Sequence, residues 1–230
     1  MASPSGNRTK QDLFDQFARI GRALASGRRL EILDFLAQRE RSVEELARMS
    51  GLSVANASQH LQVLRTAGLV EARKEGTHVH YRLAGDDVFA LCQSLRTTGE
   101  TRLAEIEKLA GVYRKDRNSL EAISLQELRR RMREGSVLVL DVRPAEEYAD
   151  GHIPGARNIP LAELKKSMKG LPEECEIVAY CRGPYCFLSD DAVAALRQSG
   201  RKALRLSHGF PDWKALGWKV EGIGGGRTPV

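Results

Sequence analysis

Apolar and polar positions follow a helical pattern through the first part of the chain. Apolar residues recur every three or four positions from Leu13 to Leu36 and again from Val54 to Thr66, a spacing that places them on one helix face. Between these stretches, Ser42 and Glu45 form a capping-box pattern, which predicts a short helix. Two short helices joined by the tight segment from Ser50 to Ser53 predict a helix-turn-helix.

The pattern then changes to that of a β-hairpin. Two runs with strand-like composition, Leu69–Arg73 and His78–Leu83, flank a turn that contains Gly76. Helices followed by such a hairpin predict a winged helix-turn-helix. Helical spacing returns over residues 86–113 and stops at the polar segment 114–119, where we place the domain boundary.

The second half alternates between short apolar runs and amphipathic segments. The apolar runs predict strands, and the segments between them predict helices. Strands are expected at 137–142, 177–180 and 203–206, and helices at 124–133, near 162–168 and at 190–198. Short, wholly apolar strands that alternate with helices indicate a parallel sheet covered on both faces. The chain is therefore expected to hold a mainly-α domain followed by an α/β domain.

Composition fits two folded domains and excludes some classes of protein. Of the 230 residues 42% are hydrophobic, and no apolar run approaches the ~20 residues that a membrane helix needs. The start lacks an apolar signal core, so we expect a cytoplasmic protein with no membrane partner. The four cysteines are too few and too unevenly spaced for a secreted disulfide scaffold. A net charge of +6 permits nucleic-acid binding without establishing it.

The segment 54–66 has the surface chemistry of a DNA-reading helix. Its apolar residues, which lie on one face and are expected to pack on the domain, are Val54, Ala57, Leu61 and Leu64. Short hydrogen-bonding side chains on the opposite face suit base edges in the major groove. These side chains are Asn56, Ser58, Gln59 and Gln62, with His60 at the margin. A solvated helix face is the alternative, but such faces usually carry more Lys and Glu.

This half resembles the ArsR/SmtB family of dimeric bacterial repressors over about residues 11–112. The resemblance rests on Ser53, Ser58 to Leu64, Ala67 to Val70, Arg73, Gly76, Tyr81 and Leu83. It implies a homodimer built on the first and last helices. Recognition helices would enter successive major grooves of double-stranded operator DNA, while wings reach flanking phosphates or the minor groove. The candidate DNA contacts are Ser53, Asn56, Ser58, Gln59, His60 and Gln62 around the recognition helix, and Arg73, Lys74, His78 and Arg82 in the wing.

Many members of that family sense metals, and this sequence lacks the ligands that they use. No cysteine occurs from Ser42 to Ser50, where the family's arsenic and cadmium sensors carry a Cys-x-Cys pair. The last helix has acidic residues but no histidine. We therefore expect no metal and no cofactor. Cys92 lies in an apolar stripe, which is typical of a small buried side chain, and a sensing thiol is the alternative.

Residues from about 121 to 222 resemble a single rhodanese domain, the sulfurtransferase fold. The matching stretches are Leu140 to Arg143, Glu147 to Pro160, Tyr180 to Gly183 and His208 to Trp213. The expected fold is thus a mainly-α winged helix-turn-helix followed by an α/β rhodanese-like domain with a parallel sheet. We expect a flexible tail at 1–10, the DNA-binding and dimerisation domain at 11–116, the rhodanese-like domain at 117–222 and a second tail at 223–230.

The most reactive-looking segment is the loop Cys181-Arg-Gly-Pro-Tyr-Cys186, which follows a predicted strand at the carboxyl edge of the sheet. Backbone N–H groups, the dipole of the next helix and the charge of Arg182 should favour the thiolate of Cys181. This thiolate could take a sulfane sulfur and become a persulfide, whereas an inert buried thiol is the alternative. Pro184 removes one N–H donor, so we expect weak activity with thiosulfate.

The second cysteine of the loop distinguishes this chain. Cys186 could attack a persulfide on Cys181, which would form a disulfide and release sulfide, or a longer sulfur bridge could be retained. A cysteine that only fills loop space is the alternative. Phe187 stands where phosphatases and arsenate reductases of this fold need an arginine, which argues against that chemistry.

Supporting positions are expected around the loop. Asp141 ends a predicted strand and is expected near the site, while Arg143 is expected to pair with Glu146 or Glu147. Packing or turn roles are expected for His152, His208 and Cys175.

Together these features predict a DNA-binding transcriptional repressor whose rhodanese domain senses or processes reactive sulfur through a Cys181 persulfide and Cys186. Its partners would be operator DNA, a second copy of the chain, a sulfane-sulfur donor (thiosulfate, polysulfide or persulfide) and an acceptor thiol. One alternative is a sulfurtransferase enzyme with an autoregulatory DNA-binding domain. Another is a repressor that responds to arsenite through its thiols.

Overall fold

The computed structural model describes residues 4–115, 121–172 and 174–222, which group into two compact units. One unit spans Met1–Thr97 and the other Thr98–Val230. The domain boundary predicted at 116/117 and the tail predicted at 223–230 lie outside the described residues. The first helix begins at Pro4, inside the stretch 1–10 that is expected to be a tail.

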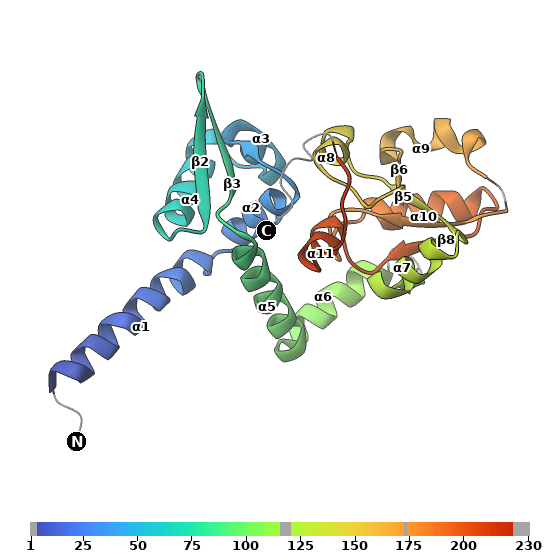
Figure 1. Ribbon diagram of the computed structural model, residues 1–230. Helices are drawn as coiled ribbons and strands as arrows, with labels where there is room; N and C mark the ends of the chain where they lie inside the picture. The colour runs from blue at the N-terminus through green and yellow to red at the C-terminus, as the bar shows by residue number, and fades with distance from the viewer. Residues whose placement is uncertain (1–3, 116–120, 173, 223–230) are drawn as a thin grey trace. The chain divides into compact units, whose positions relative to one another are not determined.

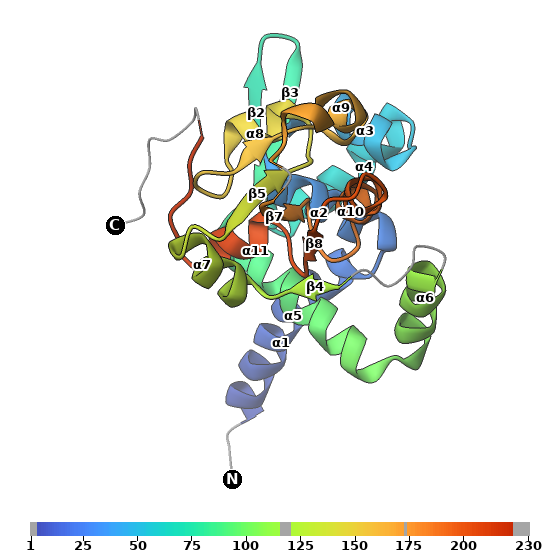
Figure 2. The ribbon, with the colours of Figure 1, turned by 90° about the vertical axis from the view of Figure 1, so that its right-hand side faces the viewer.

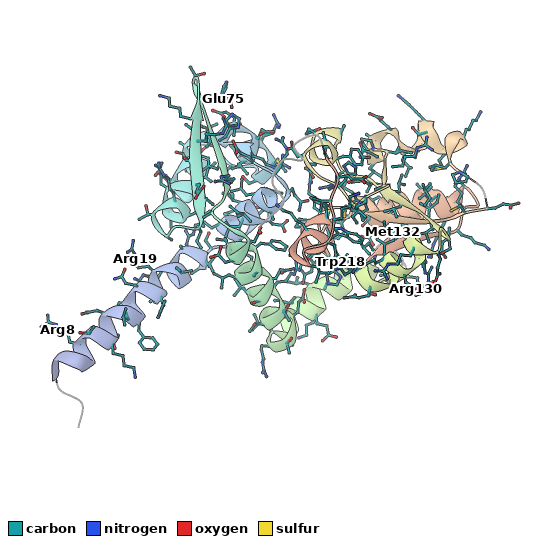
Figure 3. The ribbon with its side chains drawn as sticks, viewed as in Figure 1. Arg8, Arg19, Glu75, Arg130, Met132 and Trp218 are labelled. Atoms are coloured by element: carbon teal, nitrogen blue, oxygen red, sulfur yellow. The ribbon has the colours of Figure 1, made fainter. Side chains whose placement is uncertain are left out.

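The first unit is a winged helix-turn-helix, as predicted (Figure 1). In chain order its elements are α1 (Pro4–Leu24), α2 (Gly27–Gln38), β1 (Arg41–Ser42), α3 (Val43–Ser50), α4 (Val54–Thr66), β2 (Val70–Glu75), β3 (His78–Leu83) and α5 (Asp86–Arg102). The last residues of α5 belong to the second unit, and so does the helix that follows, α6 (Ala104–Lys115). The strands form an antiparallel sheet in the order β1-β3-β2. The β2–β3 hairpin projects away from the helices, and Glu75 lies at its tip (Figure 3).

Local capping fixes the helix-turn-helix. The Ser42 hydroxyl accepts from the Glu45 N–H at 3.2 Å, and the Glu45 carboxylate accepts from the Ser42 N–H at 3.1 Å, which confirms the capping box. Ser53 caps α4 by accepting from the Asn56 N–H at 3.2 Å. Gly51, with φ of 66°, ends α3 in the left-handed region. The helices pack around fully buried side chains that include Ile32, Leu46, Leu61 and Leu64.

Two helical predictions differ from the structure. Val54 is expected in the buried face of α4, but it is 48% exposed, because it is the first residue of the helix and precedes the packed turns. The single helix expected over 86–113 is instead α5 and α6, with the break at Leu103. Gly99 and the neighbouring threonines have weak helix propensity, which favours a break in this region.

The second unit contains, in its described part, a five-stranded parallel sheet flanked by helices (Figure 2). The strands, β4 (Ala122–Ile123), β5 (Val137–Asp141), β6 (Arg157–Asn158), β7 (Glu176–Tyr180) and β8 (Ala203–Leu206), take the spatial order β4-β8-β7-β5-β6. The helices are α7 (Leu125–Arg133), α8 (Ala145–Asp150), α9 (Leu161–Ser167), the 3-10 turn η1 (Met168–Gly170), α10 (Leu188–Gln198) and α11 (Phe210–Ala215). The predicted α/β architecture is confirmed.

Alternate strand residues pack into two cores, one on each face of the sheet. In β7, Val178 and Tyr180 join the core that α7 and α11 cover, whereas Ile177 and Ala179 join the core that α9 and α10 cover. Cys181 continues the second series, and its buried side chain joins the same core. The strand alternation therefore delivers this thiol to the start of α10.

Candidate functional site

The loop between β7 and α10 is held against the chain segment that leads into α11. The Cys181 carbonyl oxygen accepts a hydrogen bond from the Phe210 N–H at 3.2 Å. At Gly209 a Cβ atom would lie 2.1 Å from the Arg182 carbonyl oxygen, closer than real side chains approach backbone. Only glycine therefore permits this close packing, which shapes the loop.

Cys181 is a buried thiol that keeps its proton. The residue is 2% exposed, and its Sγ donates to the Cys186 carbonyl oxygen at 3.1 Å and lies 3.2 Å from Ser189 Oγ. Burial raises the pKa of Cys181 well above its ordinary value, and Cys186 raises it further, while Ser189 opposes the shift. The sequence predicts a favoured Cys181 thiolate. The structure differs because desolvation outweighs the donors at the start of α10.

Cys186 has the opposite electrostatic character. It is half-buried and packs against the core that contains Cys181. A hydrogen bond from the Cys181 thiol lowers the pKa of Cys186 to about 7. Burial works against this shift, whereas the N–H groups of Arg182 and Leu188 and the Arg182 charge work with it. At pH 7 the pair as a whole is therefore about half ionised.

Arg182 is bound to Glu147, a contact that the sequence does not indicate. Its Nε lies 3.0 Å from both carboxylate oxygens and its Nη2 lies 2.6 Å from Oε1. Glu147 is 1% exposed, so a buried carboxylate fixes the guanidinium in place. Arg182 thus contributes its charge to the thiol pair from a fixed position.

Asp141 and Arg143 form a second buried ion pair. Both are 0% exposed, and Arg143 Nη2 lies 2.7 Å from Asp141 Oδ2. Burial lowers the pKa of Arg143, but the bond to Asp141 outweighs this and raises it, and the charge of Glu147 adds to the rise. The structure thus gives Arg143 the partner Asp141, where the sequence suggests Glu146 or Glu147. Asp141 pairs in register with Tyr180, the last residue before the loop, and so supports the strand that carries the first thiol.

The two histidines contact their neighbours in the chain, and Cys92 is half-buried where the sequence suggests a buried side chain. The His152 ring stacks on Tyr148 with centroids 3.7 Å apart, and His208 Nδ1 lies 2.8 Å from Ser207 Oγ. Cys92 packs half-buried against the core of the first unit. Burial raises the pKa of Cys92 to about 11, so this thiol stays protonated and weakly reactive near neutral pH.

Three residues that shape the loop have no assigned role there from sequence alone: Glu147, Ser189 and Gly209. Glu147 and Gly209 lie within the stretches that resemble a rhodanese domain, but their contacts with the loop join distant parts of the chain. A role for Ser189 could have been found from its position, because its hydroxyl lies in the first turn of the helix that follows the loop. Cys175, expected in a surface turn, lies in the bend before β7 and is half-buried.

The recognition helix α4 exposes most of the polar side chains that the sequence places on its outer face. Its buried residues are Ala57, Leu61 and Leu64. Of the polar residues that the sequence places on the outer face, Asn56, Gln59 and Gln62 are exposed. Ser58 and His60 are half-buried, and the Ser53 hydroxyl is engaged in capping the helix. The helix can therefore present three hydrogen-bonding side chains directly to a groove.

The candidate wing residues are largely exposed and several have acidic neighbours. The shortest N–O distances are 2.7 Å for Arg73 with Glu40, 2.5 Å for Arg82 with Glu71 and 3.9 Å for His78 with Glu44. The Lys74 side chain is exposed. Ion pairs at an exposed surface are weak, so DNA phosphates can compete for the guanidinium groups of Arg73 and Arg82.

Two further observations concern the described residues as a whole. None of their helices is long and apolar enough to cross a membrane. Among the same residues, no three His, Cys, Asp or Glu side chains gather in the arrangement of a metal site. The chemistry that we assign to the loop is that of two thiols and the groups that donate to them.

Fold and site together define a transcription regulator that combines a winged helix-turn-helix with a rhodanese-like domain. Residues 26–72 match the family model for bacterial regulatory proteins of the arsR family. Residues 124–216 match the model for the rhodanese-like domain. The first match lies within the half that resembles the ArsR/SmtB family, and the second lies within the half that resembles a rhodanese domain.

Comparison with known proteins identifies the family. The chain is 47% identical over 212 residues to the HTH-type transcriptional regulator Rv0324 of Mycobacterium tuberculosis, covering 92% of this chain and 93% of that protein. It therefore belongs to the ArsR family of transcriptional regulators, in a form that carries a C-terminal rhodanese domain. Human thiosulfate:glutathione sulfurtransferase is 35% identical over 85 residues, 37% of this chain and 72% of that protein. A homodimeric winged helix-turn-helix DNA-binding domain of Mycobacterium bovis, solved by NMR, is 50% identical and covers 45% of this chain and 94% of its own, with a TM-score of 0.41.

Proposed function

We propose that this regulator is a homodimeric repressor of the cytoplasm that binds operator DNA and responds to reactive sulfur through Cys181 and Cys186. The thiol pair carries the proposal. The Cys181 thiol donates a hydrogen bond to the Cys186 carbonyl oxygen at 3.1 Å, and the pKa of Cys186 is lowered to about 7. A thiolate at neutral pH beside a second thiol suits uptake of a sulfane sulfur, followed by a disulfide or a sulfur-bridged state.

Unpartnered apolar surface on the helices that flank the recognition motif supports the dimer. On α1, Leu13, Phe14 and Phe17 are 56%, 55% and 66% exposed. The exposed apolar side chains of α5, of α6 and of the break between them are Leu91, Leu95, Leu103, Leu109 and Val112. Clustered large apolar side chains on a helix surface are typical of a protein interface. A second copy of the chain, packed on the same helices, is the occupant that we propose.

The DNA contacts follow from the exposed polar face of α4 and from the wing. Asn56, Gln59 and Gln62 would read base edges, because amide side chains bond adenine and other edges in the major groove. Ser58 and His60 would contribute from the margin of that face, and Ser53 would orient the start of the helix. Phosphate contacts would come from the wing residues Arg73, Lys74, His78 and Arg82.

The donor that the loop suits best is a polysulfide or a small persulfide. Thiosulfate is a dianion, and its sulfite leaving group needs free positive charge and N–H donors. Here Glu147 already binds the Arg182 guanidinium, and Pro184 has no N–H to offer. With a persulfide donor the leaving group is a thiolate, and with a polysulfide it is hydrosulfide or a shorter polysulfide, so neither donor needs a site for sulfite.

Fluorescence anisotropy with operator DNA tests this function. Reduced protein should bind the DNA, and polysulfide-treated protein should bind with altered affinity that a reductant restores. Cys181→Ser protein should bind DNA as before but should not respond to polysulfide. An equal response in Cys181→Ser protein, or an unchanged affinity after treatment of the native protein, would remove the sensing role.

A second candidate is a sulfurtransferase enzyme with an autoregulatory DNA-binding domain. The similarity to human thiosulfate:glutathione sulfurtransferase favours this candidate. Steady-state turnover with thiosulfate or persulfide as donor and glutathione as acceptor would support it. Stoichiometric arsenite binding that is lost in Cys186→Ser protein would instead support an arsenite-responsive repressor.

A further inference from the structure

We propose that the hydrogen bond between Tyr185 of the thiol loop and Glu100 of α5 is the link through which a change of sulfur state in the loop acts on the DNA-binding unit. The proposal rests on the proposed function, because it concerns how the response of Cys181 and Cys186 is transmitted. The two linked residues are 85 positions apart in the sequence.

Tyr185 reaches the end of α5 through its phenol. The hydroxyl donates to Glu100 Oε1 at 2.5 Å, a distance typical of an O–H group bonded to a charged oxygen. Both residues belong to the second compact unit. A charged acceptor makes such a bond stronger than a neutral one, so it can hold the phenol in place although Tyr185 is 45% exposed.

A tight turn joins Tyr185 to the second thiol. The Cys186 N–H donates to the Gly183 carbonyl oxygen at 3.1 Å, which closes a four-residue turn. Pro184 is the second residue of this turn, where its fixed φ is favoured. Tyr185 is the third residue. Because the turn is closed by its own hydrogen bond and stiffened by proline, a displacement of Cys186 also displaces the phenol.

The sulfur of Cys181 is enclosed on the side of this turn. Cys181 is 2% exposed, and its Sγ lies 3.1 Å from the Cys186 carbonyl oxygen and 3.2 Å from Ser189 Oγ. Close-packed interiors leave few voids, so another sulfur atom beside Cys181 has to displace a neighbour. Ser189 is itself buried in α10, whereas the turn borders solvent at Tyr185. The turn is therefore the neighbour that we expect to move.

The chemistry that would move the turn is that of the proposed function. Cys181 takes the outer sulfur of a donor RS–SH, in which R is an organic group or the rest of a polysulfide chain. The donor S–S bond breaks, and its electron pair leaves with RS⁻. Cys186 then attacks Cys181 Sγ, a disulfide forms, and the outer sulfur leaves with the electron pair of the broken bond. The two thiol protons and the proton of the donor end on RSH and hydrogen sulfide, so the donor is the only oxidant required.

These steps also remove a contact that holds the turn. In the persulfide and in the disulfide, Cys181 Sγ is bonded to a second sulfur and carries no proton. It can then no longer donate to the Cys186 carbonyl oxygen, as it does in the reduced loop. Loss of this hydrogen bond and the need for space act on the same turn, and both shift Tyr185 relative to Glu100.

α5 extends from the first unit into the second. It is one continuous helix, whose start belongs to the first unit and whose last turn, with Glu100, belongs to the second. Near its start, Val88 lies in the buried core of the first unit. Leu91 and Leu95 belong to the exposed apolar surface that the proposed dimer would use. Release of the last turn of α5 would therefore act, through one helix, on the DNA-binding unit and on its dimer contacts.

Tyr185→Phe protein tests the link, because this change removes only the hydroxyl. In the reduced state it should already bind operator DNA as tetrasulfide-treated native protein does, a shift of about threefold to tenfold, which is the size that one exposed hydrogen bond to a charged group can supply. Sodium tetrasulfide should then change its affinity by less than about twofold, since the link that it would break is absent. Fluorescence anisotropy measures both affinities.

The chemistry of the loop should survive in Tyr185→Phe protein, and mass spectrometry checks this. Trypsin cleaves after Arg182, so a disulfide between Cys181 and Cys186 joins two peptides, and a Cys175→Ser background assigns the bond to Cys181. The joined peptides should appear after tetrasulfide treatment to the same extent as in the native loop. Absence of the disulfide in Tyr185→Phe protein would place Tyr185 in the sulfur chemistry itself and overturn its role as a link.

Substitutions on the helices provide the matched controls. Glu100→Ala should shift the affinity of the reduced protein as Tyr185→Phe does, and the double variant should shift it no further, because both changes remove the same bond. Glu107→Ala changes an exposed carboxylate of the neighbouring helix α6 and should bind and respond as native protein does.

Amide hydrogen exchange distinguishes a broken link from an altered fold. Tetrasulfide should speed exchange in the last turn of α5 of native protein at least about threefold, and Tyr185→Phe protein should show the fast rate before treatment, while α7 exchanges as in native protein. A full change of operator affinity in treated Tyr185→Phe protein, or additive shifts in the double variant, would overturn the link and leave the sulfur response standing. If native protein forms the disulfide without any change in operator affinity, the proposed function itself fails.

Discussion

Two half-buried cysteines of this chain, Cys92 in the first unit and Cys186 in the second, have very different acidities. Burial raises the pKa of Cys92 to about 11, whereas the hydrogen bond from Cys181 lowers that of Cys186 to about 7. Both are partly covered by apolar neighbours. The difference arises from donors: Cys186 has a thiol, two backbone N–H groups and a guanidinium around it. Partial burial alone therefore does not decide whether a cysteine is inert.

The largest expected effect concerns the scaffold that holds the reactive region. Asp141→Ala leaves Arg143 charged and buried without its partner, and breaking a buried ion pair costs about 3–5 kcal/mol. The free energy of unfolding of the second unit should fall by that amount. Urea titration followed by tryptophan fluorescence measures this, because both tryptophans, Trp213 and Trp218, lie in that unit.

The matched control breaks an exposed ion pair in the first unit. Glu40→Ala removes one of the two carboxylate partners of Arg73 and leaves the other, Glu75, so it should change stability little, because surface ion pairs are weak. Circular dichroism of the same titration reports on the helical first unit. An Asp141→Ala effect as small as that of Glu40→Ala would contradict the supporting role of the buried pair.

The next effect separates the two cysteines directly. Cys186→Ser should abolish the change in operator affinity that polysulfide causes, because a disulfide or sulfur-bridged state of the loop needs both thiols. Cys92→Ala should keep the response, because a thiol with a pKa of about 11 is protonated at neutral pH. Anisotropy titrations with and without polysulfide measure both variants. A response to polysulfide that survives in Cys186→Ser but disappears in Cys92→Ala would show that Cys92, and not Cys186, is the responsive thiol.

A smaller effect concerns the donors around Cys186. Arg182→Gln removes a positive charge and leaves the Glu147 carboxylate unbalanced, and both changes disfavour the thiolate. The midpoint of alkylation against pH should therefore move upward from about 7. A rise to about 8 would slow alkylation at pH 7 about fivefold. Arg157→Gln, which changes an exposed arginine of the same unit, should leave the midpoint in place.

The smallest effect lies in the wing. Lys74→Ala should weaken DNA binding to a similar degree for all sequences and reduce the slope of log affinity against log salt by about one. Gln59→Ala should instead reduce discrimination between operator and mutated operator, with the salt slope unchanged. Titrations at several salt concentrations distinguish the two. A change in slope for Gln59→Ala and none for Lys74→Ala would contradict their assigned contacts.

The features that sequence reasoning predicts well are local. Ser42 with Glu45, and Ser53 before α4, form caps over three residues, so the sequence contains both partners of each contact. The strands β5, β7 and β8 of the second unit are likewise predicted, because each is long enough to form a recognisable run of apolar residues. The two-residue strands β4 and β6 and the six-residue helices α8 and α11 are too short for such a pattern.

The protonation of the thiols could not be predicted because it depends on distant partners. Glu147 is 35 residues before Arg182. Gly209, which packs on the loop, comes after both α10 and β8 in the sequence. The sequence shows that Cys181 has charge and N–H donors nearby, but not that desolvation outweighs them. It likewise shows Arg143 near several acidic residues without revealing that Asp141 binds it.

The glycine that packs against the loop limits where the loop can move. Since a Cβ at Gly209 would already lie 2.1 Å from the Arg182 carbonyl oxygen, the two backbone segments are in close contact, and the peptide after Cys181 cannot move closer to Gly209. Under the proposed function, a bond between the sulfurs of Cys181 and Cys186 would therefore have to be accommodated by the rest of the loop. Gly209 thus serves as a fixed boundary for any change of shape that follows the chemistry.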